Sequence, residues 1–228
     1  MLRTLFFACC LVTPVLVSAQ VGHDPLKSPY RDLEYRQELS FIGGRFDAAI
    51  DPARVAPTGG PMLGAHYELR LGGPVYFTAR VVGVLSNRSV IDPKLEVVNR
   101  IKGDRSVPMV MADAGFSLNL TGFKSWHGIV PVLGGGLGLG AGFEKLDVGG
   151  YRFGYPFLVT ARPGIKVARR GLWQGRIDAT NYFYRIRYPD TYFVKTGADA
   201  PVLEPGSARS YWKRNLGVTA GITRTFGR

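Results

Sequence analysis

Histidine is the side chain that most often acts as a general base or zinc ligand near neutral pH, and this sequence contains three: His23, His66 and His127. His66 and Glu68 are two positions apart, so they share one face of an extended segment. No serine or cysteine nucleophile is placed with this pair. These spacings do not support a catalytic triad, a zinc site or a paired-carboxylate hydrolase. We therefore expect no enzymatic activity, no metal and no cofactor.

Glycine occupies every second position from Gly134 to Gly142. Residues Gly136 to Ala141 fit a loose G-x-G-x-x-A pattern, but the run lacks the Lys-Ser/Thr of a phosphate-binding loop and does not precede a helix. The alternating glycines instead share one face of an extended segment, opposite leucines. We interpret them as an inner wall that leaves room for large side chains such as Arg162 and Lys166. A small ligand channel along the glycines is the alternative.

Charged side chains share faces with small polar residues in several extended segments. If these faces line a small barrel, its own side chains fill the interior, and the buried charges need partners. We expect a luminal charge network made of Glu68, Arg70, Arg80, Asp113, Arg162, Lys166, Arg176 and Asp178. Because bases outnumber acids in this set, water or the N-terminal tail is expected to supply some of the balance. A proton or ion path through the network is the alternative.

The elements that would position these residues are strands, because apolar and polar residues alternate with a period of two. The alternation is clearest in residues 63–72, 110–121, 157–168 and 212–226. It is rougher but compatible in residues 37–49, 74–87, 128–145 and 171–187. The sequence therefore predicts eight strands, each with one apolar and one polar face.

Connections of two lengths alternate between these strands. Residues 72–73, 122–127 and 169–171 form short connections, and residues 50–60, 88–106, 146–155 and 188–209 form long ones. Short turns at one end and long loops at the other are typical of outer-membrane barrels, in which the apolar face contacts lipid. We therefore predict an all-β, eight-stranded antiparallel up-and-down transmembrane β-barrel. A soluble secreted barrel, with its apolar face inside, is the alternative.

Strand length and aromatic residues favour the membrane barrel. Several strands exceed the five or six residues usual in soluble sheets and approach the 9–11 residues needed to cross a bilayer. Two belts of aromatic side chains are expected at the membrane interfaces. The candidates are Tyr182, Phe183, Tyr184, Tyr188, Tyr192, Tyr211 and Trp212 near the long loops, and Phe123, Trp126, Trp173 and Phe226 near the short turns.

The N-terminus predicts export. Residues 1–19 combine a basic start, an apolar stretch and a small-residue cleavage site, which is the pattern of a signal peptide. The two cysteines, Cys9 and Cys10, lie within it. We expect a periplasmic tail over residues 20–36 and the barrel over residues 37–228. The net charge is +12, but the bases are spread along the chain, so we expect no nucleic-acid partner.

The signal peptide, the glycine-rich fifth strand and the last strand, Leu216 to Phe226, resemble the small bacterial outer-membrane β-barrel superfamily, which includes the OmpA-type transmembrane domain. The resemblance covers residues 37–228. It implies residence in the bacterial outer membrane and insertion by the barrel assembly machinery, which reads an aromatic residue at the C-terminus. Here Phe226 is followed by Gly227 and Arg228.

Bases gather around the last long loop, at the end of the barrel that would face outward. Guanidinium groups bind phosphates in a bidentate manner, and the outer leaflet consists largely of phosphorylated lipopolysaccharide. Arg185, Arg187, Arg209 and Arg214 are therefore the predicted lipopolysaccharide contacts. A merely solvated, charged loop is the alternative.

The function that follows is that of an integral outer-membrane barrel, monomeric, with a structural or surface-interaction role and without catalysis. A narrow pore or carrier for a small solute is the first alternative. The second is an outer-membrane enzyme that modifies lipid A.

Overall fold

A computed structural model describes residues 28–168, 171–195 and 199–227. Its strands are β1 Tyr30–Asp32, β2 Gln37–Asp47, β3 Gly60–Gly72, β4 Val75–Ile91, β5 Ile101–Asn119, β6 Lys124–Trp126, β7 Ile129–Gly142, β8 Phe157–Val167, β9 Trp173–Arg187 and β10 Ser210–Phe226. Two short 3-10 helices are η2 Val97–Asn99 and η3 Asp190–Phe193. Among the described residues, no helix has the length and hydropathy needed to cross a membrane. The predicted signal peptide lies outside the described residues.

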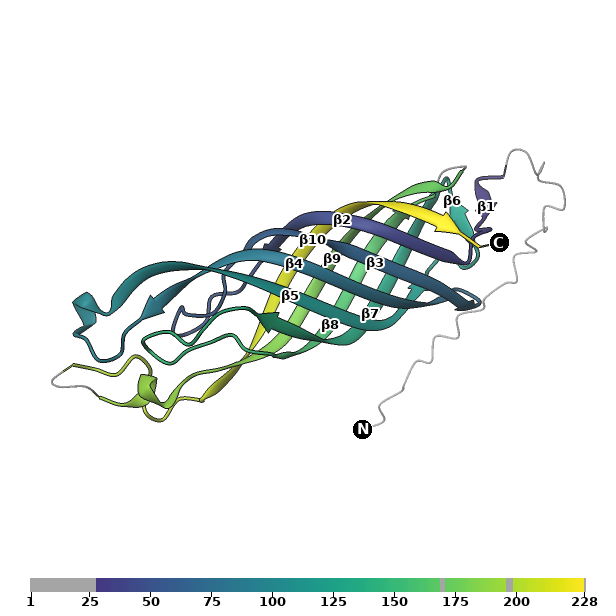
Figure 1. The fold of residues 1–228 in the computed structure, drawn as a ribbon. Coiled ribbons are helices and arrows are strands. Elements are labelled where there is room, and N and C mark those ends of the chain that lie inside the picture. The colour runs from purple at the N-terminus through teal and green to yellow at the C-terminus, as the bar shows by residue number, and fades with distance from the viewer. Residues whose placement is uncertain (1–27, 169–170, 196–198, 228) are drawn as a thin grey trace, which may run out of the picture.

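Eight of the strands form a closed antiparallel ring, in the order β7-β5-β4-β3-β2-β10-β9-β8 and back to β7 (Figure 1). The first and last strands of the ring, β2 and β10, pair along eleven residues, from Gln37 opposite Phe226 to Asp47 opposite Leu216. The short strands β1 and β6 pair with each other beside one end of β7. The predicted all-β, eight-stranded antiparallel barrel is therefore confirmed.

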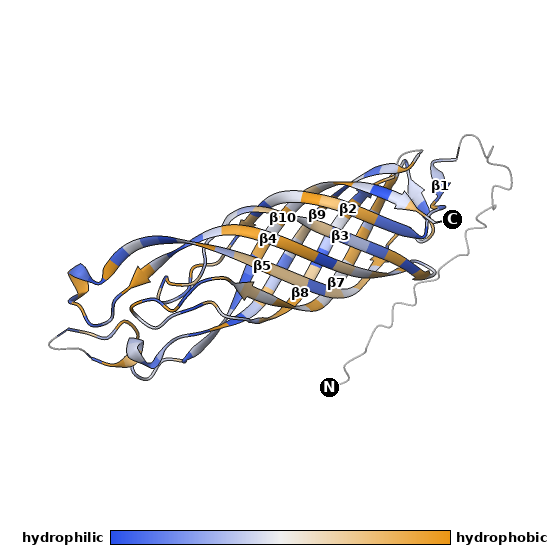
Figure 2. Cartoon of the chain, in the orientation of Figure 1, coloured by the Kyte–Doolittle hydropathy of each residue, from blue (hydrophilic) through white to orange (hydrophobic). Residues whose placement is uncertain are grey.

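The side chains of the strands point inward or outward as the alternation of polar and apolar residues predicts. In β5, Asp113 and Asn119 point inward and are buried, whereas Phe116 and Leu118 point outward and are exposed. The same holds around the ring, so exposed apolar residues cover the outside of the strands. Figure 2 shows the hydrophobic and hydrophilic residues interspersed along the strands. A soluble barrel would have the reverse arrangement, because its apolar face packs inward. The prediction that the apolar face points outward is confirmed.

The second long connection differs from the prediction. Residues 88–106 were expected to form a loop, but β4 and β5 remain paired from Arg88 opposite Arg105 to Ile91 opposite Ile101. Only residues 92–100 connect the two strands, and the hairpin extends well beyond the ring (Figure 1). In β5, residues 101–106 are exposed on both faces. There is consequently no apolar face through which a two-residue period could reveal the strand.

Four tyrosines assigned to an interfacial belt are buried instead, two on the inner face of β9 and two within the fourth long loop. Tyr182, Tyr184, Tyr188 and Tyr192 are each at most 4% exposed. In β9, even-numbered residues point inward, as Asp178 does, so Tyr182 and Tyr184 follow the same parity. The outward-facing aromatics at this level are Phe183 and Trp212; Tyr211 is exposed, but it shares the inward parity of Lys213 and lies opposite the buried Ile186. The predicted belt was therefore wrong for the four tyrosines.

These tyrosines belong to an apolar core that fills the half of the barrel near the long loops. Side chains from three of these loops pack into the core: Ala53, Val55 and Ala56 from the first, Tyr151 and Phe153 from the third, and Tyr192 and Phe193 from the fourth. The strands contribute residues such as Phe46, Met62, Met109 and Leu158. The long loops thus cover one end of the barrel with buried apolar side chains.

The segment before β2 covers the opposite end. Leu33 packs against Val130 and Val132 at the inner wall. Its amide donates to the carbonyl of Phe123 at 2.8 Å, and the amide of Arg36 donates to the carbonyl of Gly227 at 2.7 Å. Residues 28–36, part of the predicted tail, are therefore fixed across the end at which the short turns lie.

Candidate functional site

Asp113 is the centre of one half of the charge network inside the barrel. Its Oδ2 accepts hydrogen bonds from Arg80 Nε at 2.9 Å and Nη2 at 2.7 Å, and its Oδ1 accepts one from Arg162 Nη2 at 3.0 Å. Thr160 Oγ1 lies 3.3 Å from Oδ1. All of these side chains are buried. Arg80 lies opposite Asp113 in the β4–β5 pairing, so the strand register itself places the pair.

Glu68 is the centre of the other half. It forms ion pairs with Lys166 and, at 3.5 Å, with Arg176. Lys166 also pairs with Glu38 at 3.0 Å. Arg176 binds Asp178 with two nitrogens, Nε at 2.7 Å and Nη2 at 3.1 Å. Each carboxylate in this half therefore has a buried cation as its partner.

His66 connects the two halves. Arg162 Nη1 donates to His66 Nε2 at 3.1 Å, and His66 Nε2 lies 3.5 Å from Glu68 Oε1. His66 is fully buried. His127 lies in the turn after β6 and has a positive φ of 50°, and His23 lies outside the described residues. Within the described ranges, no group of three or more His, Cys, Asp or Glu residues could hold a metal ion.

The network is balanced in charge, in contrast to the expected excess of bases. Four carboxylates, Glu38, Glu68, Asp113 and Asp178, face four cations, Arg80, Arg162, Lys166 and Arg176. Glu38 was missing from the predicted set, although it shares the inward face of β2 with Ser40 and Ile42. A balanced set of paired charges is the form in which ionised groups persist in a low-dielectric interior.

Arg70 was predicted to belong to this network, but it does not. Its Nη1 donates to the carbonyl of Leu33 at 2.8 Å, and its guanidinium lies 5.6 Å from the ring centre of Phe123. It is the inward-facing residue nearest the end of β3. There the segment before β2 offers a carbonyl, so Arg70 fixes that segment instead of pairing with a luminal carboxylate.

The alternating glycines of β7 allow this strand to approach β5 closely. A Cβ at Gly138 would lie 2.0 Å from the carbonyl oxygen of Ala112, and one at Gly136 would lie 3.2 Å from Asp113 Oδ1. Any larger residue would therefore push against β5 or against the carboxylate that holds Arg80 and Arg162. The row serves close packing of β7 against β5, whereas the sequence interpretation expected it to leave room for Arg162 and Lys166.

Beyond the network, a buried ion cluster and a buried, hydrogen-bonded carboxylate hold the long loops in place. Arg88 binds Glu144 at 2.6 Å and Asp147 at 2.8 Å, and its guanidinium lies 4.9 Å from the ring centre of Tyr151. In the first loop, Asp51 accepts a hydrogen bond from the Tyr188 hydroxyl at 2.9 Å. Burial and the Asp51 carboxylate raise the pKa of Tyr188, so this phenol remains a donor at neutral pH.

Three of the four predicted lipopolysaccharide contacts lie together on the outer surface. Arg185 and Arg187 line two adjoining depressions of about 440 and 500 Å³, and Arg209 lines the second of them. Arg152, from the third long loop, lines the first. Arg214 lines neither depression, and its Nε donates to Asn181 Oδ1 at 3.0 Å. The sequence interpretation missed Arg152 because it considered only bases near the fourth loop.

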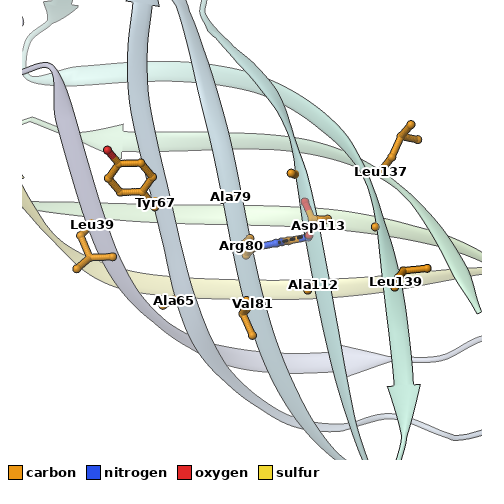
Figure 3. Close-up of a pocket in the computed structure, with 12 residues that line it drawn as sticks. Leu39, Ala65, Tyr67, Ala79, Arg80, Val81, Ala112, Asp113, Leu137 and Leu139 are labelled. Atoms are coloured by element: carbon orange, nitrogen blue, oxygen red, sulfur yellow. Dashed lines mark hydrogen bonds and ion pairs between the residues drawn. The ribbon is translucent and has the colours of Figure 1, made fainter. Parts of the chain in front are cut away.

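A further depression, of about 560 Å³, lies in the lipid-facing wall (Figure 3). It is lined mainly by the small outward residues Ala65, Ala79, Ala112 and Ala114, between Leu39 and Tyr67 on one side and Leu137 and Leu139 on the other. The Arg80–Asp113 pair lies beneath it. The depression is part of the apolar surface that surrounds the strands.

No protein-family model and no curated protein sequence matches the chain. Among solved structures, the outer membrane protein OprG from Pseudomonas aeruginosa superposes with a TM-score of 0.50 at 10% identity, covering 88% of this chain and all of OprG. Neisserial surface protein A gives 0.45 at 11% identity, with coverages of 87% and 98%. Ail of Yersinia pestis, in complex with the heparin analogue sucrose octasulfate, gives 0.35 at 13% identity, with coverages of 82% and 99%.

The chain therefore has the fold of the small eight-stranded outer-membrane barrels, as the resemblance implied. Its exposed apolar surface and its buried, paired charges are the arrangement that a bilayer requires. This fold and this surface agree with the predicted location in the bacterial outer membrane.

Proposed function

We propose that the protein is a closed surface barrel of the outer membrane, with a structural or surface-interaction role and no transport or catalysis. The observation that supports this most strongly is the filled interior. Paired charges occupy one half of the barrel, and apolar side chains from strands and loops occupy the other. What remains available to partners is the outer surface: the long loops, the β4–β5 hairpin and the basic residues beneath them.

A narrow pore is the weaker alternative. A passing ion would have to separate the Arg80–Asp113 pair, whose side chains are each 1% exposed, and then cross the layer of buried aromatics at Tyr182 and Tyr184. Both steps oppose conduction, since separating a buried pair leaves uncompensated charge. A lipid A-modifying enzyme is also weaker, because His66 is enclosed between Arg162 and Glu68.

The proposed partners are the lipids of the outer membrane and above all lipopolysaccharide, with the assembly machinery acting during insertion. Arg185 and Arg187 end β9 on its outward face, where Arg185 lies opposite Trp212. An aromatic side chain at headgroup level with bases beside it suits contact with a phosphorylated glycolipid. We propose that the barrel makes this contact as a monomer.

Reconstitution in planar bilayers tests the closed barrel. We expect no conductance steps, because both ends and the interior are filled by the chain's own side chains. An open porin inserted under the same conditions provides the positive control. Stable, reproducible conductance levels from the folded protein would instead favour the pore.

The leaflet contact has its own test. We expect the variant Arg185→Gln, Arg187→Gln, Arg209→Gln, Arg214→Gln to fold but to retain less lipopolysaccharide during purification at low salt. The difference should shrink at high salt, because exposed charge pairs are screened. Equal retention by the folded variant and the wild type at low salt would contradict this contact.

A further inference from the structure

Two adjoining depressions on the outer surface form one continuous basic surface. We name it the rim groove; it lies between the third long loop, the end of β9 and the start of β10. The first depression includes Arg152, Phe153 and Tyr155, and the second includes Asp190 and Arg209. Both share Arg185, Arg187, Tyr188, Pro189 and Ser210. A ligand in one half would therefore lie against the same two arginines as a ligand in the other.

The rim groove has an excess of positive charge. Four arginines line it against a single acid, Asp190, which is already paired with Arg209. Arg185 uses its Nε for Ser210 Oγ at 2.7 Å, which leaves its two terminal nitrogens available. Within the part of the chain that the structure describes, neither Arg152 nor Arg187 forms an ion pair. Such uncompensated guanidiniums attract a ligand that brings more than one negative charge.

Apolar side chains border the first half of the rim groove. Leu146 is 61% exposed and Tyr155 is 76% exposed, and both line it together with Phe153 and Pro156. Phe157, half exposed, follows directly on the outward face of β8. Exposed apolar groups beside unpaired arginines suit a ligand in which phosphate and hydrocarbon are adjacent, whereas a fully hydrated anion gains nothing from them.

We propose that the rim groove binds a phosphorylated amphiphile carrying two phosphate groups, one in each half, with Arg185 and Arg187 shared between them. The inference deepens the proposed contact with lipopolysaccharide: it assigns that contact to a defined groove, adds Arg152 and excludes Arg214. Both a lipid headgroup and a free anion could supply the phosphate. The apolar side chains that border the groove favour the lipid as the ligand.

Binding measurements on the full-length barrel in detergent test this assignment, with lipid A, monophosphoryl lipid A and inorganic pyrophosphate as the probes. We expect the variant Arg152→Gln, Arg187→Gln to bind lipid A at least tenfold more weakly than the wild type. Neither residue has an internal ion pair, so the variant should fold normally, as checked by heat-modifiable migration. The matched control, Arg54→Gln, Arg105→Gln, removes two exposed arginines outside the rim groove, one in the first long loop and one in β5, and should bind as the wild type does.

The probes separate the possible ligands. We expect monophosphoryl lipid A to bind about tenfold more weakly than lipid A, and pyrophosphate not to compete at equal concentration. Competition by pyrophosphate as strong as that by lipid A would contradict the proposal that the ligand is an amphiphile. Wild-type affinity for lipid A in the Arg152→Gln, Arg187→Gln variant would contradict the rim groove as the binding site. If the fourfold Gln variant still retained less lipopolysaccharide, the broader contact with the outer leaflet would hold without the rim groove.

Discussion

Asp113→Asn will lower the free energy of unfolding by about 3–5 kcal/mol, the cost of removing one partner of a buried ion pair. The substitution keeps the size of the side chain but removes the charge that holds both Arg80 and Arg162. Both guanidiniums are nearly inaccessible to water, so solvent cannot replace the carboxylate. Urea unfolding of the barrel in phospholipid vesicles, followed by tryptophan fluorescence, measures the loss.

Two comparisons make this result specific. Asp104→Asn alters an exposed carboxylate of the same strand, which accepts a hydrogen bond from Ser89 Oγ at 2.7 Å, and should cost less than about 1 kcal/mol. Adding Arg80→Met to Asp113→Asn restores the charge balance and should recover part of the stability. A loss below about 1 kcal/mol for Asp113→Asn itself would show that the luminal arginines do not depend on this carboxylate.

Ala114→Arg will destabilise the barrel by about 2–4 kcal/mol, because it places a cation on the lipid-facing wall near mid-membrane. Ser106→Arg is the matched control. It is also exposed and has the same outward parity on the same strand, but it lies about 27 Å further along at 3.4 Å per residue. There the hairpin has left the ring, so the substitution should cost about 0–1 kcal/mol.

The same urea titration compares the two variants. Equal losses for Ala114→Arg and Ser106→Arg would mean that the membrane does not surround the wall at Ala114. A larger loss for Ser106→Arg would place the hydrocarbon over the hairpin and contradict the orientation of the barrel.

The strands and their facing were predictable because each residue of a membrane-spanning strand faces either lipid or the interior. In β5 the apolar residues Ala112, Ala114 and Phe116 alternate with the polar residues Asp113 and Ser117, and this pattern indicates which residues face lipid and which face the interior. The paired set of eight strands follows from the alternation together with the two lengths of connection. Where both faces are exposed, as in residues 101–106, the pattern disappears and the strand was mistaken for loop.

The candidate sites were predictable only in part, since contacts between distant segments leave no local pattern. Seven of the eight residues assigned to the luminal network lie in it, because inward parity identifies them. Glu38 shares that parity but lies at the start of a strand with a rougher pattern. Arg70 has the right parity too, yet the carbonyl of Leu33 is its nearer partner.

The apolar half of the interior shows the same limit. Tyr182 and Tyr184 share parity with Asp178, so their inward facing could have been read from the sequence. The burial of Tyr151 and Tyr192 could not, because it depends on how separate loops fold over the barrel. Arg152 joins the basic residues of the fourth loop for the same reason.

Accessibility along β5 tests the closed membrane barrel most directly. The two cysteines of the sequence, Cys9 and Cys10, lie in the predicted signal peptide, so single cysteines at Met111, Ala112, Ala114, Phe116 and Ser117 can be labelled one at a time. We expect a lipid-soluble quencher to reach labels at the outward positions 112, 114 and 116, and a water-soluble maleimide to react at none of the five. Reaction at Met111 and Ser117 would reveal a water-filled channel, and reaction at the three outward positions would show a wall that faces water; either result would contradict the closed membrane barrel.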